Sequence, residues 1–246
     1  MTTVIDGTTG VTFPAGGVGN PAGAVVGTTD TQALYNKSIG SGYQLITAPL
    51  TTTAIASAFE YNGIAPYFTP QGTQRGIIPA GQFYRLNSTN AGANATGAQS
   101  LFGVGVTLSA STVYAFEGYV MLIKSAGATA HTVSYGFGGT ATVNNAAFGG
   151  VASTNASSIA PINTNVFSGY TLSLASTAFT TSLATATIWT ALKFQGTVSV
   201  NAGGTFIPQY TLSAAPGGAY TVQIGSYINI YPVSLSGSNT SIGAWA

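Results

Sequence analysis

The side chains that could carry acid, base or nucleophilic chemistry are few in this chain. Among its 246 residues there are four carboxylates, one histidine and no cysteine. The acidic residues are Asp6, Asp30, Glu60 and Glu117, and the histidine is His131. General acid–base catalysis needs such groups held close together, each with a pKa suited to its role. Two of the acids lie in a Gly/Thr/Ala-rich N-terminal stretch, so three candidates remain in the rest of the chain.

Two catalytic arrangements can be built from these candidates. A Ser-His-acid triad would have to use His131, but the chain has no Gly-x-Ser-x-Gly elbow to present the serine. A glycosidase pair would have to be Glu60 with Glu117, whereas sugar clefts usually bring more acids and more exposed tryptophans than Trp189 and Trp245. Neither arrangement is supported, so we predict a protein that is not an enzyme.

Metal and cofactor sites have no better support in the sequence. No group of His, Cys, Asp or Glu has the spacing of metal ligands. The glycine-rich piece at 136–139 (GFGG) is not followed by a helix or a lysine, so it is typical of a turn and not of a phosphate-binding loop. We predict no catalytic, metal-binding or cofactor-binding residues.

The segment Thr112–Lys124 (TVYAFEGYVMLIK) is apolar at both its odd and its even positions. Aromatic and β-branched residues in this pattern predict a central strand packed on both faces, in the middle of a two-layer β core. Glu117 interrupts it, and a buried carboxylate must be paired. Lys193 and Arg85 are the candidate partners, so we predict that Glu117, Arg85 and Lys193 form a structural polar core or a polar subunit contact. The alternative, a catalytic acid with a raised pKa, needs a second acid or base nearby.

The composition indicates a folded protein that lives in an assembly. Charged residues make up 4% of the chain, against about 25% in ordinary soluble proteins. With 45% hydrophobic and 11% aromatic residues it can bury a sizeable core, so it is not disordered. A net charge of +1 without a Lys/Arg cluster makes nucleic acid a poor partner. Little charge repulsion keeps copies apart, so we predict a homotrimer that buries exposed tyrosines, namely Tyr119, Tyr210, Tyr220, Tyr227 and Tyr231.

Several targeting and processing features are missing from the sequence. Without cysteine there can be no disulfide framework. The residues after Met1 lack the basic and apolar regions of a secretory signal, and no apolar run reaches the length of a membrane helix. We therefore expect synthesis and assembly in a cytoplasm, without insertion into a membrane.

The chain divides into three regions by composition. Residues 1–42 are rich in Gly, Thr and Ala, which predicts an extended arm ordered by binding along another protein. Residues 43–58 continue as a short linker or stalk, and residues 59–246 form a β domain. The predicted attachment residues are the isolated or paired apolar side chains of the arm: Val4, Ile5, Val11, Phe13, Val25, Val26 and Leu34.

The third region alternates between β-strand patterns and turn sequences. Because no amphipathic helix separates the strands, the pattern predicts an all-β fold, an antiparallel jelly-roll sandwich preceded by the extended arm. The predicted strands lie near residues 59–62, 82–86, 101–108, 112–124, 132–137, 166–174, 187–200, 205–212, 220–224 and 226–233.

Three passages, the third in two pieces, together resemble surface proteins of tailed-bacteriophage particles. Residues 12–39 (TFPAGGVGNPAGAVVGTTDTQALYNKSI) are similar to N-terminal segments that lead into a fibre or knob. Residues 60–86 (EYNGIAPYFTPQGTQRGIIPAGQFYRL) resemble a C-terminal jelly-roll knob, as do residues 195–213 (QGTVSVNAGGTFIPQYTLS) and 225–233 (GSYINIYPV). The resemblance implies a homotrimeric, non-enzymatic virion protein, with the arm as the virion-attachment segment and the knob facing outward.

Linker length helps to choose between positions on such a particle. Residues 43–58 span about 50 Å when fully extended, too little to project a knob far from the particle. This favours a capsid decoration (cement) protein or short head fibre, bound to the shell through its arm. The alternative is a short tail fibre or receptor-binding protein of the tail, which would have a host surface glycan as a possible partner.

Overall fold

The computed structural model describes residues 4–6, 10–12, 45, 47–155 and 165–245. Its described residues form strands and turns and no helix, so no helix among them could cross a membrane. The all-β prediction is confirmed.

The chain divides into two units, Met1–Gln44 and Leu45–Ala246. This boundary lies two residues beyond the predicted end of the arm. In the first unit, β1 (Val4–Asp6) pairs antiparallel with β2 (Gly10–Thr12).

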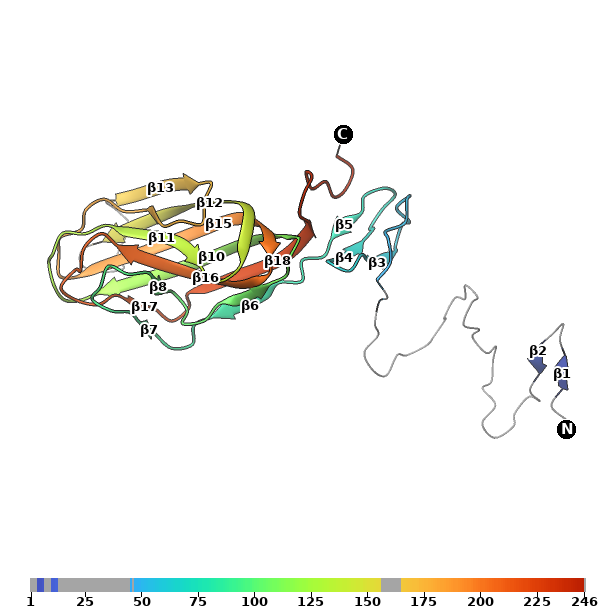
Figure 1. Ribbon diagram of the computed structural model, residues 1–246, viewed down its shortest axis with the longest axis horizontal. Helices are drawn as coiled ribbons and strands as arrows, with labels where there is room; N and C mark the ends of the chain where they lie inside the picture. Colours follow the sequence, from blue (N-terminus) through green and yellow to red (C-terminus); the bar gives the residue numbers. More distant parts are fainter. Residues whose placement is uncertain (1–3, 7–9, 13–44, 46, 156–164, 246) are drawn as a thin grey trace. The chain divides into compact units, whose positions relative to one another are not determined.

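The second unit is built on a large antiparallel sheet (Figure 1). At one end of this sheet β10 (Thr112–Lys124) pairs with β17 (Thr221–Val222), which pairs with β7 (Asn90–Ala91). From edge to edge the main order is β13 (Asn165–Thr171), β12 (Thr142–Asn155), β15 (Ile188–Ala202), β10 (Thr112–Lys124), β18 (Tyr227–Leu235) and β6 (Gln82–Arg85).

A second antiparallel sheet packs against the first and completes a sandwich (Figure 1). Its strands are β14 (Thr177–Ala178), β11 (Val133–Gly138) and β16 (Gly204–Leu212), with β8 (Gln99–Ser100) and β9 (Val106–Leu108) both pairing with β16. The chain passes repeatedly between the layers: β7 to β8, β9 to β10, β10 to β11, β11 to β12, β13 to β14 to β15, and β15 to β16 to β17. Crossing from sheet to sheet in this way, instead of running through one sheet first, is how a jelly-roll sandwich is connected.

The central strand β10 has one buried face and one face turned to the outside. Its even-numbered residues are buried, whereas its odd-numbered residues are partly or fully exposed. The prediction that both faces are covered is therefore wrong for the single chain. The second sheet covers the even face, and no described strand covers the odd one.

Phenylalanine rings fill the space between the layers. Phe137 stacks on Phe206 with ring centroids 4.4 Å apart, and Phe116 meets Phe137 edge-on at 4.9 Å. Glycine makes room for these rings: a Cβ placed on Gly118 would come within 2.4 Å of the Phe194 ring. Such a contact is far inside van der Waals distance, so a side chain at this position would displace the core.

The longest strand that the sequence analysis missed is β12. Its sequence, TVNNAAFGGVASTN, is rich in Asn, Gly and Ala, which have low intrinsic β propensity. It forms a strand because β15 and β13 pair with it on its two sides. The opposite error occurred at residues 101–108, where only Val106–Leu108 is a strand.

The predicted linker is not a free stalk. Within the second unit, β3 (Phe59–Tyr61), β4 (Pro66–Phe68) and β5 (Gly76–Ile77) form a small antiparallel sheet. The linker is hydrogen-bonded to it, since the backbone N–H of Ala48 donates to the carbonyl of Tyr61 at 3.2 Å. Backbone groups that bond to a sheet lose the freedom that a projecting stalk would need.

Candidate functional site

The predicted polar core of Glu117, Arg85 and Lys193 does not form inside the protein. All three residues are exposed, and no ion pair joins them in the described part of the chain. Glu117 lies opposite Gln195 on β15 and opposite Asn229 on β18. The prediction of a buried group is wrong, because the odd face of β10 is open and water hydrates these charges.

These three charged residues nevertheless share one surface, the solvent-facing side of the large sheet, called here the outer sheet face. The register places Tyr119 beside Tyr227 and Lys193, and Arg85 beside Tyr227. Apolar side chains lie between the charges. Phe83 is 60% exposed and stacks on Tyr227 at 5.3 Å. Tyr119, Val151 and Tyr170 are also exposed.

A shallow groove of about 590 Å³ lies at the other side of this face, over β12. Its lining includes the small residues Ala147 and Gly149 together with Tyr170, Lys193 and Gln195. Tyr210 and Tyr220, which the sequence analysis placed among the exposed tyrosines, are buried between the layers instead. Of the tyrosines expected to be exposed, Tyr119 is exposed, whereas Tyr210 and Tyr220 are not.

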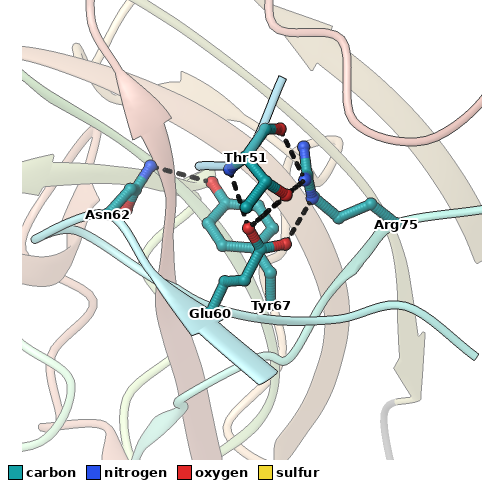
Figure 2. Close-up of polar contacts among 5 residues, drawn as sticks. All are labelled: Thr51, Glu60, Asn62, Tyr67 and Arg75. Atoms are coloured by element: carbon teal, nitrogen blue, oxygen red, sulfur yellow. Dashed lines mark hydrogen bonds and ion pairs between the residues drawn. The ribbon is translucent and has the colours of Figure 1, made fainter. Parts of the chain in front are cut away.

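The ion pair in the described part of the chain joins Glu60 and Arg75 on the small sheet (Figure 2). Arg75 Nε donates to Glu60 Oε2 at 2.7 Å, and Nη2 approaches Oε1 at 3.3 Å. Thr51 closes the cluster: its N–H and hydroxyl both donate to Glu60 Oε1, at 2.8 and 2.9 Å, and its carbonyl accepts from Arg75 Nη2 at 2.8 Å. The sequence analysis did not foresee this pairing, because 15 residues separate the partners.

The Glu60 carboxyl is held in its ionised form. Burial acts to raise its pKa, but the hydrogen bonds from Thr51 and Arg75 and the positive charge of Arg75 outweigh burial and lower the pKa below its ordinary value. A glycosidase general acid needs the opposite, a raised pKa that keeps the proton available. This geometry gives no support to Glu60 as the acid of a sugar-cleaving pair.

Beside the small sheet lies a second groove, of about 620 Å³. One wall comes from the segment before β3 and from the loop between β4 and β5, including Thr52 and Thr73. The other comes from the end of β18 and the C-terminal segment, including Ser238 and Ser241. Because hydroxyl-bearing side chains predominate, we call it the hydroxyl groove.

A buried polar cluster at one end of the sandwich was also missed. Lys124 is almost fully buried, and its Nζ lies within hydrogen-bond distance of the backbone carbonyls of Ala126, Gly127, Thr185 and Ala186, which share its three N–H donors. No carboxylate of the described residues accompanies it in this cage, and burial lowers its pKa. The ammonium ties the turn after β10 to the loop before β15. No spacing in the sequence distinguishes this lysine from an ordinary strand end.

His131 lies in the same buried region. Its Nδ1 is 2.7 Å from the Thr129 carbonyl and its Nε2 is 2.7 Å from the Tyr220 hydroxyl. Both ring nitrogens are therefore engaged, and neither faces a serine and an acid as a catalytic triad would require. Burial lowers the pKa of His131, the Thr129 carbonyl opposes this, and the charge of Lys124 adds to it.

The remaining predicted residues belong to the arm. Val4, Ile5 and Val11 lie in β1 and β2, whereas Phe13, Val25, Val26 and Leu34 lie outside the described residues. Within the described ranges, no group of three or more His, Cys, Asp or Glu could hold a metal ion.

No family model matches the chain, and no curated protein matches it closely enough to indicate a relative. Its function must be inferred from its own residues.

Proposed function

We propose that this chain is a non-enzymatic structural protein on the surface of a tailed-bacteriophage particle, with the arm bound to the particle and the sandwich facing outward. The proposal favours a trimeric capsid decoration protein or short head fibre. Its phage identity rests on the resemblance of residues 12–39 and of the knob passages. Self-assembly of the knob rests on an independent structural observation.

That observation is the outer sheet face. A face on which Phe83, Tyr170 and Val151 are each at least half exposed loses favourable burial as long as it remains in water. Lys193 and Arg85 share this face with Glu117, so it carries both signs of charge and two copies of the surface can be complementary. A closed ring of three copies would bury the apolar residues and place Glu117 of one copy against a cation of the next.

The arm fits the attachment role by composition. It forms a unit separate from the sandwich, and its apolar residues are spaced by Gly and Pro. Such a segment cannot build a core of its own and gains most by lying along grooves or sheet edges of another protein.

Charge exchange on the outer sheet face tests the oligomer. Light scattering on a column peak of the full chain is expected to give three times the monomer mass. Glu117→Lys should shift the peak towards monomer. Adding Lys193→Glu should restore the trimer, because the pair of opposite charges between copies is rebuilt with its signs exchanged. A wild-type protein that stays monomeric at micromolar concentration would contradict the proposal.

The hydroxyl groove favours a second candidate function, a short tail fibre or receptor-binding protein. A groove of this size and polarity is of little use to a protein that only reinforces a shell, whereas a receptor binder needs one. Copy number per particle separates the two candidates, since a shell carries hundreds of equivalent positions and a tail only a handful.

A further inference from the structure

The hydroxyl groove is lined by several side chains whose hydrogen-bonding groups have no partner among the described residues. No hydrogen bond within the described part of the chain uses the side chains of Thr52, Thr53, Thr73, Ser238, Asn239 or Ser241. Each hydroxyl can both donate and accept, and the amide can do both through separate atoms. The matching ligand is one with many hydroxyl groups of its own.

The charges beside the groove are already balanced. Arg75 is the one charged side chain among the described residues that line it. Its Nε and Nη2 are held by Glu60 and Thr51 (Figure 2), so the pair adds no net charge. An anionic ligand would gain little attraction here, and the groove is better suited to a neutral one.

An aromatic platform stands next to this groove. Trp245 is 80% exposed, which is uncommon for so large an apolar surface. Its indole Nε1 donates to the carbonyl of Ile242 at 2.6 Å, and Ile242 and Gly243 line the groove. The hydrogen bond fixes the direction of the ring while leaving its faces open. An aromatic face is negatively polarised and attracts the C–H groups on the apolar side of a sugar ring.

We propose that the hydroxyl groove binds a neutral carbohydrate, with one sugar ring stacked on Trp245 and its neighbour hydrogen-bonded to the hydroxyl side chains. The volume of about 620 Å³ falls within the range of small-molecule sites and suits a short stretch of a glycan. This inference rests on the proposed function, because it assumes a knob that faces outward. Oligomeric state and particle loading test that function without any sugar, so the two can fail separately.

Binding is tested with the full chain on an array of neutral and acidic glycans. We expect binding to at least one neutral glycan, and affinity for its soluble oligosaccharide is then measured by calorimetry. Trp245→Ala and Ser241→Ala should each weaken the affinity, the tryptophan change by at least about tenfold. Phe59→Ala is the matched control, because Phe59 is an exposed aromatic residue of β3 that lines neither the hydroxyl groove nor the outer sheet face, and it should leave the affinity unchanged.

Fluorescence locates the bound sugar. The chain has two tryptophans, and Trp189 carries a buried indole nitrogen without a hydrogen-bond partner in the described residues, so Trp189→Phe should fold and leave Trp245 as the reporter. Its emission should shift to the blue when the oligosaccharide is added. The proposal is overturned if no glycan binds, if only anionic glycans or inorganic phosphate bind, or if Phe59→Ala abolishes binding while Trp245→Ala does not.

Discussion

Tyr220 and His131 form a buried pair, with 2.7 Å between the phenol oxygen and Nε2. The contact at Nδ1 fixes their roles. Because the Thr129 carbonyl can only accept, Nδ1 must carry the proton, and Nε2 of the neutral ring then accepts from the Tyr220 hydroxyl. Protonating the ring would remove this acceptor and add a second positive charge in the region of Lys124. The fold therefore favours neutral histidine.

Stability should depend on pH near neutrality through His131. The pKa of His131 is lowered below 6.5 in the folded state. Between the pKa values of the folded and unfolded states, the unfolded chain therefore binds more protons than the folded chain. Stability should therefore be complete above pH 6.5 and fall as the pH drops below it, by at most about 1.4 kcal/mol per pH unit. Urea unfolding between pH 5 and 7.5 measures this slope. His131→Gln should flatten it, and an unchanged slope in that variant would assign it to other groups.

Lys124 should contribute more to stability than any surface lysine. Lys124→Met leaves four backbone carbonyls without their donor, and although it also removes the cost of burying an ammonium, we expect a net loss of about 1–3 kcal/mol. Lys193→Met is the matched control, since Lys193 is exposed. Measured in the Glu117→Lys variant, which is expected to be monomeric, it should change the free energy of unfolding by less than about 0.5 kcal/mol. Equal effects of the two variants in denaturant titrations would show that the carbonyl cage does not stabilise the fold.

The strands that sequence predicts best are those whose side chains decide their structure. Thr112–Lys124 was identified because aromatic and β-branched residues dominate it. The burial of its second face could not be read from the same residues, since coverage depends on where other strands, or other copies, are placed. β12 was missed for the reverse reason, because pairing with β13 and β15 imposes the strand on a sequence of low propensity.

The candidate sites also differ in whether a residue's own side chain or its neighbours in the fold decide its environment. The sequence shows that Glu117 needs a partner or water, but it cannot tell which, and the structure places it in water. Partners distant in the chain, such as Arg75 for Glu60 and the carbonyls around Lys124, are created by folding. The hydroxyl groove was equally invisible, because Ser and Thr occur throughout this chain and only the approach of the C-terminal segment to the small sheet gathers them.

The Glu60 cluster should hold the segment before β3 in place. Glu60→Gln keeps one acceptor oxygen but removes the charge and turns an amide donor towards Arg75, so we expect a loss of about 1 kcal/mol confined to the small sheet. Hydrogen exchange of the Thr51 amide, which donates to Glu60, should quicken about fivefold. Since the pKa of Glu60 is lowered from 4.5, the same protection in the wild type should be lost as the pH falls below 4.5. Glu117→Gln should affect neither, because Glu117 is exposed.

Removing the arm should separate attachment from folding. Because Met1–Gln44 and Leu45–Ala246 are separate units, deletion of residues 1–40 should leave the sandwich folded, with an unchanged melting temperature and oligomeric state. The truncated chain should fail to load onto particles that lack the protein, since the apolar anchors Val4, Ile5, Val11 and Phe13 are gone and each buried side chain of this size contributes about 1.5–3 kcal/mol. Phe13→Ser in the full chain should weaken loading measurably, with Asp30→Ser as a control for an arm substitution that removes no apolar surface. Normal loading of the truncated chain would instead make the sandwich the docking surface, and the division of roles between arm and knob would be wrong.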